Sequence, residues 1–121
     1  MAKTLVDLYA FGNRRRPRPP RTGADVFPDA LGMVGPEDPA DPNGASAVTD
    51  VSLSLMHGHY HRLPAGTSLP EGLSVVADGS DVNTASRHGP GHHTIYPATA
   101  MLLNEFIELF ENLPWKYGGK K

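Results

Sequence analysis

Short runs rich in apolar residues recur along the chain, and most are bounded by glycine, proline or asparagine. Runs of this length predict strands rather than helices, and we expect them over residues 4–11, 58–64, 73–78 and 92–97. The run LSVVAD at 73–78 has the clearest strand pattern, and Pro97 closes the last of the four. The pattern therefore predicts a fold built mainly from short strands.

Near the C-terminus the spacing of apolar residues changes to that of a helix. Apolar side chains recur three or four positions apart, with acidic and amide side chains elsewhere on the helical wheel, at Leu102, Phe106, Leu109, Phe110 and Leu113. This spacing predicts one amphipathic helix. Pro114 should end it, Trp115 should pack back on the core, and residues 117–121 should fray.

The segment ASAVTDVSLSLM at 45–56 fits two structures. Ser46 or Thr49 could cap a short helix, whereas the VSLSL stretch alternates as a strand does. We favour a short helix near 46–52.

Composition indicates many turns and long loops. The 121 residues include 13 glycines and 12 prolines, and both residue types interrupt regular structure. The stretch RRRPRPPR at 14–21 should be an extended basic loop, because proline fixes φ and removes a hydrogen-bond donor. Strands followed by one helix are typical of an α+β fold, and the length suits a single domain over residues 1–121.

Charge and cysteine content exclude several classes of function. The formal net charge of −2 provides no general attraction for nucleic acid or anionic membranes, and without cysteine there is no disulfide or thiolate zinc site. The first residues, MAKTLVDLYAFG, lack the length and flanks of a secretory signal, and no later segment is long enough to span a bilayer. We expect a soluble cytoplasmic monomer that does not enter membranes.

Histidines supply candidate chemistry at two places. In HGHYH the three imidazoles lie two residues apart, so a strand would place them on one face, where neighbouring imidazoles could bind zinc or copper. No carboxylate or cysteine stands at a fixed spacing to complete such a site. We expect no metal here, with His59 and His61 lining a cleft or facing water and Tyr60 packing on the opposite side.

The second place is HHTIYP at 92–97. Strand alternation puts His92 and Thr94 on one face and His93 and Ile95 on the other. Because Ile95 fits the core, we expect His93 to be partly buried and His92 to point outward. A two-histidine phosphoesterase would need a second His-x-Thr/Ser motif, which the sequence lacks.

Carboxylates suited to acid–base catalysis are scarce. The three glutamates of the predicted helix fit its solvated face, which leaves Asp50 and Asp78 as the plausible candidates. A hydrolase with paired carboxylates is therefore poorly supported.

The stretch LPAGTSLPEGLSVV, followed by GHHTIYPA and a terminal amphipathic helix, resembles the exported effector-two family of ADP-ribosyltransferase-like toxins of type VI secretion. In that family an Asp/Ala-Gly-Thr-x-(Ile/Leu)-Pro-x-x-Leu stretch precedes a His-(Tyr/His)-Thr-Ile-x-Pro strand; they correspond here to 65–73 and 92–97. The resemblance follows most of the chain and is specific over 63–97. It implies a split β-sheet with few short helices, a cleft for NAD, and a cognate immunity protein that blocks the cleft.

The resemblance also implies that Ser46 and His92 form the functional centre. Cleavage of the nicotinamide–ribose bond of NAD passes through an oxocarbenium-like state, so positioning and electrostatics carry most of the catalysis. Imidazole can hold ribose hydroxyls, a serine hydroxyl can bond the carboxamide, and guanidinium can bind pyrophosphate. We expect the remaining NAD contacts to come from Tyr9, Arg14, Arg15, Arg16, Tyr60 and Thr94.

Two positions depart from the family pattern. Ala45 replaces a threonine before Ser46, and Ala10 replaces an arginine of the first strand, so phosphate contacts must come from the basic loop. These changes keep a catalytically inactive interaction module open as an alternative, and the basic loop keeps a nucleic-acid-directed toxin open. The ADP-ribose acceptor is undefined. As a toxin of this kind, the protein would reach the target-cell cytoplasm without a signal peptide.

Overall fold

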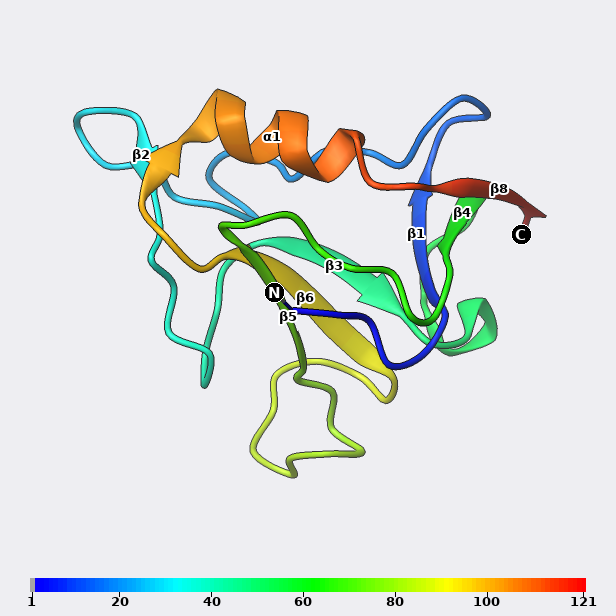
Figure 1. Cartoon of the computed structure of the whole chain (residues 1–121). Coiled ribbons are helices and arrows are strands. Elements are labelled where there is room, and N and C mark those ends of the chain that lie inside the picture. The colour runs from blue at the N-terminus through cyan, green and yellow to red at the C-terminus, as the bar shows by residue number, and fades with distance from the viewer. Residues whose placement is uncertain (1) are drawn as a thin grey trace.

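A computed structural model describes residues 2–121, and its main element is a six-stranded sheet in which every pairing is antiparallel. The strand order is β5-β6-β3-β1-β4-β8 (Figure 1). The strands are β1 (Leu8–Gly12), β3 (Ala45–Val48), β4 (His59–Leu63), β5 (Leu73–Ala77), β6 (His92–Pro97) and β8 (Lys116–Lys120). A two-stranded sheet of β2 (Met33–Val34) and β7 (Met101–Leu102), the 3₁₀ turn η1 (Val51–Leu53) and helix α1 (Leu103–Glu111) complete the fold.

The large sheet is split between β1 and β3. These two strands share one paired position, Tyr9 with Val48, whereas β1 pairs with β4 over five positions. In Figure 1, β3 and β6 run across the view and β1 runs down it, so the two halves of the sheet point in different directions. The sequence-based α+β class and the split sheet are both confirmed.

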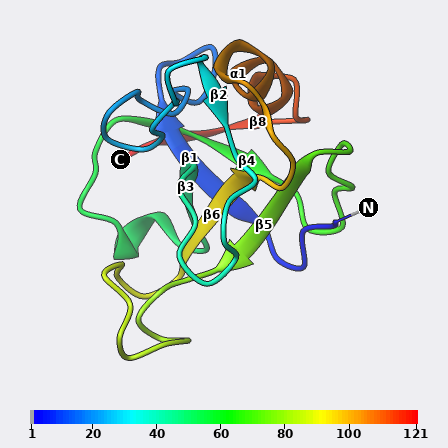
Figure 2. The same ribbon diagram turned by 90° about the vertical axis from the view of Figure 1, so that its left-hand side faces the viewer.

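Helix α1 covers the core side of the sheet. Phe106 and Phe110 are buried against side chains from both halves of the sheet, including Leu8, Leu63 and Ile95. Burial of each phenylalanine contributes roughly 1.5–3 kcal/mol. In Figure 2, α1 lies at the top and the loop 78–91 lies at the opposite end of the molecule.

The amphipathic pattern correctly predicted this helix. Leu102 is its N-cap and the helix ends at Glu111, before Pro114. The indole of Trp115 packs on Phe110 and donates its Nε1–H to the Phe110 carbonyl at 2.9 Å, as expected of a residue that returns to the core. No helix within residues 2–121 is both long and apolar enough to cross a membrane.

The helix predicted near 46–52 is wrong. Residues 45–48 form β3, and helical structure in the segment 45–56 is confined to η1, which Asp50 caps by accepting from the Ser52 amide. Ala45 and Ala47 are buried in the core while Ser46 is exposed, so the segment has strand alternation. Pairing with β6 on one side and β1 on the other satisfies its backbone, and this tertiary pairing overrides the local capping signal.

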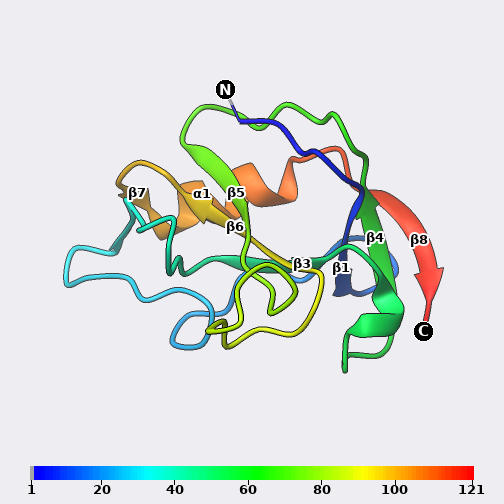
Figure 3. The same cartoon turned by 90° about the horizontal axis from the view of Figure 1, so that it is seen from below.

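The frayed tail predicted at 117–121 is also wrong, because residues 116–120 form β8 on the edge of the sheet beside β4 (Figure 3). Gly118 and Gly119 lie against the ring of Tyr60, where a side chain would not fit: a Cβ at Gly118 would be 2.7 Å from Cδ2 of that ring. Glycine therefore permits the close approach of β8 to β4.

The same edge corrects the expectation that His61 lines a cleft or faces water. His61 is 2% exposed; its Nε2–H donates to the Asn13 carbonyl at 2.7 Å, and the ring of Tyr117 packs against it edge-on. His59 contacts the Tyr117 hydroxyl through Nδ1 at 2.9 Å. His61 therefore supports the sheet edge, whereas His59 stays partly exposed beside β8. Tyr60 packs against Tyr9 and Phe11, as predicted.

We predict that Gly118→Ala destabilises the fold by about 1–3 kcal/mol, because the added methyl group overpacks the Tyr60 ring. Urea unfolding measures the change. Lys120→Ala in the same strand is the control and should stay within about 0.5 kcal/mol of wild type, since Lys120 is exposed. Equal effects of the two substitutions would show that close packing of β8 on β4 is not required.

Candidate active site

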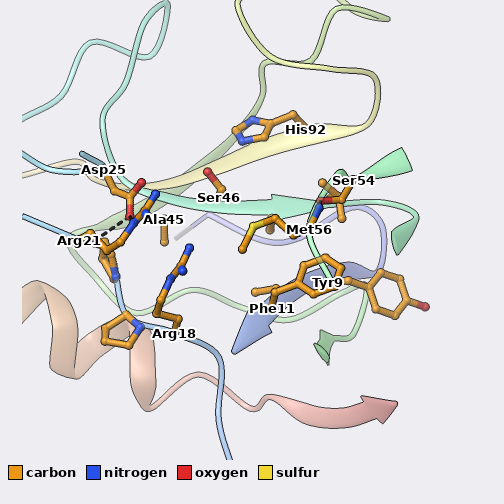
Figure 4. A pocket seen from close by; sticks show the side chains of 15 residues that line it. Tyr9, Phe11, Arg18, Arg21, Asp25, Ala45, Ser46, Ser54, Met56 and His92 are labelled. Atoms are coloured by element: carbon orange, nitrogen blue, oxygen red, sulfur yellow. Dashed lines mark hydrogen bonds and ion pairs between the residues drawn. The ribbon is translucent and has the colours of Figure 1, made fainter. Parts of the chain in front are cut away.

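A cleft of about 190 Å³ opens where the two halves of the sheet separate. Its walls come from β1, β3, the first residue of β6 and two loops, so segments far apart in the sequence meet there (Figure 4). The side chains that characterise it are Tyr9, Phe11, Arg18, Arg21, Asp25, Ser46, Ser54, Met56 and His92.

Ser46 and His92, the two residues predicted to be catalytic, both line this cleft. Antiparallel pairing of β3 with β6 sets Ser46 opposite Thr94 and Val48 opposite His92, so the serine and the histidine lie on the same stretch of sheet. In Figure 4 the serine side chain projects toward the side of the strand on which the imidazole lies. The split sheet thus brings a hydroxyl and an imidazole into one cavity.

The cleft histidine, His92, is hydrogen-bonded to a carboxylate. Asp78, the residue after β5, accepts from His92 Nδ1 at 2.6 Å through Oδ1 and from the Thr94 hydroxyl at 2.5 Å through Oδ2. His88 stacks on His92 with ring centroids 3.8 Å apart and planes 7° from parallel. Four side chains therefore form one hydrogen-bonded and stacked cluster at the edge of the cleft.

The cluster shifts two pKa values. Burial acts to raise the pKa of Asp78, but the hydrogen bonds from His92 and Thr94 and the nearby imidazoles outweigh it, so this pKa lies below the usual value of 3.8. Burial is the main cause that lowers the pKa of His88 from 6.5, and the repulsion that a protonated His88 would meet from a protonated His92 and from Arg87 adds to it. At neutral pH, Asp78 is an anion and His88 is uncharged.

The arginines that reach the cleft are not those predicted. Arg18 and Arg21 line it, with Arg21 Nε 3.2 Å from Asp25 Oδ2. Arg14 and Arg15 are exposed at a turn outside the cleft, and Arg16 pairs with Glu111 on α1. The loop folds back on the sheet, where the Arg18 amide donates to the Phe11 carbonyl at 2.9 Å, and this contact brings its second half to the cleft.

The other three residues predicted to contact NAD do not all line the cleft. Tyr9 lines the cleft at the end away from Arg21 and Asp25, whereas Tyr60 does not line it. Thr94 is only 3% exposed; it borders a second hollow, and its hydroxyl donates to Asp78.

The second hollow, of about 230 Å³, adjoins the cleft. Both cavities are bordered by Ser46 and Asp25, and the second adds polar groups from Asn43, Arg87 and His88. Ser46 therefore stands where the two hollows meet.

Asp78 and His88 are the residues of the cluster that the sequence did not assign to the site. A signal for Asp78 was present: if the strands predicted at 73–78 and 92–97 pair in antiparallel fashion, residue 78 lies beside residue 92. The structure has this pairing, with Ala77 opposite His93 and the Asp78 amide donating to the His92 carbonyl at 3.1 Å. His88 has no comparable signal, because it lies in an irregular loop.

Asp78, His88 and His92 also offer ligand atoms within 4.8 Å of one another, a spacing that a metal ion could use. The arrangement fits a metal poorly, because the carboxylate already accepts from His92 Nδ1. The two imidazole planes are nearly parallel, so their in-plane lone pairs do not converge on one point.

The split antiparallel sheet and the serine–histidine cleft at its division agree with the ADP-ribosyltransferase-like class that the motifs indicated. The family model described as Tse2 ADP-ribosyltransferase toxin matches residues 2–117, and the chain belongs to this family. A comparison with curated proteins finds no match.

The lowered pKa of Asp78 predicts a pH dependence of stability. The unfolded chain binds a proton at higher pH than the folded chain does. The stabilisation is therefore complete above about pH 4 and is lost as the pH falls through the folded-state pKa. We predict that Asp78→Asn lowers the free energy of unfolding by about 1–2 kcal/mol at pH 7, and by less at pH 3.

Urea unfolding between pH 7 and pH 3 measures this difference. The matched control is Asp81→Asn, because Asp81 lies in the same loop and accepts from the Gly91 amide, which an asparagine oxygen can also do. The control should keep the pH slope of wild type. A wild-type slope in Asp78→Asn would contradict the assignment.

Proposed function

We propose that this protein is an enzyme toxin that cleaves the nicotinamide–ribose bond of NAD and transfers ADP-ribose to an acceptor or to water. Membership of the toxin family supports the class of reaction. The observation that carries the proposal is the presence of Ser46 and His92 in one cleft at the split of the sheet. The two residues come from different strands and meet only in the folded chain.

The proposed reaction needs only NAD and an acceptor. The glycosidic bond between ribose C1′ and the nicotinamide nitrogen breaks heterolytically, and nicotinamide leaves with the electron pair. The acceptor's nucleophilic atom then bonds to C1′ and loses its proton. Ser46 is suited to hold the nicotinamide carboxamide and His92 to hold a ribose hydroxyl, so both would act by orienting the substrate as positive charge develops on the sugar.

Arg18 is the best candidate for binding the pyrophosphate. Its guanidinium reaches the cleft and makes no ion pair within residues 2–121, whereas Arg21 is held by Asp25. A free guanidinium can bind a diphosphate through paired hydrogen bonds. This assignment moves the phosphate contact from Arg14, Arg15 and Arg16 to a later residue of the same loop.

The shape of the site also suits a dinucleotide. The cleft alone is too small for the whole of NAD, but the second hollow meets it at Ser46. A nicotinamide end bound at Ser46 would leave the rest of the molecule to extend along the joined hollows.

The alanine at position 45 is compatible with activity. Ala45 is 3% exposed and belongs to the hydrophobic core, and in Figure 4 its methyl group points away from the Ser46 hydroxyl. Ala45 also lines the cleft, so replacing the family's threonine removes one hydroxyl from its wall and leaves the side chains of Ser46 and His92 in place. The retained serine and histidine favour an enzyme over an inactive interaction module.

A cognate immunity protein is part of the proposal. Leu55 is 96% exposed, and its neighbour Met56 borders the cleft. Apolar side chains at the mouth of a polar site suit a protein that covers it. The toxin would act in the target-cell cytoplasm, where its substrate is present.

We predict that Ser46→Ala and His92→Ala each lower nicotinamide release from NAD by about 10²–10³-fold, the usual cost of removing one group that stabilises a transition state. Liquid chromatography of the products measures the rate. His93→Ala is the control: His93 adjoins His92 in β6 but does not line the cleft, and its Nδ1–H donates to the Gly91 carbonyl. Full activity of His92→Ala would rule out the proposed centre.

We predict that Arg18→Ala raises KM for NAD about 10- to 100-fold, because one charge-assisted contact contributes about 1.5–3 kcal/mol. Arg15→Ala, which removes the same charge from an exposed position of the same loop, should leave KM unchanged. Initial rates over a range of NAD concentrations distinguish the two variants. The reverse result would return the phosphate contact to the first half of the loop.

A further inference from the structure

We propose that Asp78 and His88 are positioning residues that hold His92 as a hydrogen-bond acceptor for a sugar hydroxyl. Asp78 keeps the proton of the neutral imidazole on Nδ1, and His88 fixes the plane of the ring by stacking. The free lone pair on Nε2 is then the group that His92 offers to a ligand. This inference rests on the proposed function, because the hydroxyl in question is that of the NAD ribose.

The first support is the way Asp78 is held. Its amide donates to the His92 carbonyl at 3.1 Å, which fixes its backbone beside β6. Each carboxylate oxygen then has its own partner, Oδ1 with His92 Nδ1 and Oδ2 with the Thr94 hydroxyl. Because His92 and Thr94 are two apart on one strand, the carboxylate bridges neighbouring side chains on one face of β6 and has little freedom to rotate.

The second support is the chemistry of the contact. An ionised carboxylate can only accept hydrogen bonds, so His92 Nδ1, at 2.6 Å from Oδ1, must carry a proton. In the neutral imidazole the other nitrogen then has a free lone pair. Nε2 can accept from a hydroxyl but cannot donate to a carbonyl or a phosphate. The pair therefore selects a ligand group that carries a hydrogen-bond donor, as ribose does.

The third support is the stack of His88 on His92. Nearly parallel rings with centroids 3.8 Å apart tolerate two neutral imidazoles, whereas two charged rings would repel each other. The loop holds His88 there through Ser86, whose hydroxyl donates to the Asp78 carbonyl and accepts from the His88 amide. Asp78, Ser86 and His88 thus fold the 78–91 loop back onto the histidine that they orient.

The test is the tautomer of His92, measured from the ¹⁵N chemical shifts of labelled protein at pH 8. Wild type should show a protonated Nδ1 and a free Nε2. Asp78→Ala should move the proton of His92 to Nε2, while Asp81→Asn in the same loop should not. A wild-type His92 protonated on Nε2 would overturn the inference without recourse to any variant, so the test stands even if Asp78→Ala fails to fold.

Kinetics give a second readout that a purely structural role would not produce. We expect His88→Ala to lower kcat for nicotinamide release about 10-fold or more, and His88→Phe, which restores a flat uncharged ring, to recover most of it. Equal loss in both variants, or full activity in His88→Ala, would show that stacking does not position His92.

The outcomes separate this inference from the function on which it rests. If His92 has the predicted tautomer and loses it in Asp78→Ala, but wild type releases no nicotinamide, the proposed function fails and the orientation of His92 stands. If wild type cleaves NAD and Asp78→Ala does so equally well, the function stands and the positioning role is wrong.

A zinc titration tests the competing use of the same residues. One equivalent of Zn²⁺ should leave the ¹⁵N shifts of His88 and His92 unchanged. Joint shifts of the two imidazoles that EDTA reverses would identify a metal site instead and would overturn the inference.

Discussion

The narrow join between β1 and β3 is the constraint on which the functional architecture depends. One paired position connects the two halves of the sheet, and the cleft occupies the space that a continuous ladder would have closed. Helix α1 stabilises the divided sheet, because its buried phenylalanines contact side chains from both halves. The core thus holds together two short sheets whose backbones scarcely pair with each other, and the cavity forms where they separate.

The pattern of hydrophobic residues predicted the secondary structure correctly where a segment carries its own periodicity or turn signals. The strands at 59–63, 73–77 and 92–97 and the helix at 103–111 satisfy this condition, and each was predicted within a few residues. The pattern failed where structure depends on a distant partner. Residues 45–48 become a strand between β1 and β6, and residues 116–120 become one beside β4 because Gly118 and Gly119 fit against Tyr60.

The same limit applies to the prediction of the site residues from sequence. The family motifs predicted Ser46 and His92 as one functional centre, and both line the cleft. Strand alternation supported only His92, because the segment of Ser46 was predicted to be a helix. The arginines could not be placed in this way, since proline-rich backbone has no side-chain period and its path is set by contacts such as that of Arg18 with Phe11. From the sequence, Asp78 was recognised only as a plausible catalytic carboxylate with no assigned role in the site. Its role depends on the pairing of β5 with β6, which the sequence alone left open.

The loop from 78 to 91 divides its residues between two tasks, and this division has a consequence for engineering. Asp78, Ser86 and His88 are tied to the cluster, whereas Asn83, Thr84 and Ala85 are exposed at its tip. Changes in loop length at the tip would leave the anchored ends in place. Thr84 is therefore a suitable point for attaching a fluorophore or grafting a peptide tag, which would place a probe on the same loop as His88 without replacing a residue of the cluster.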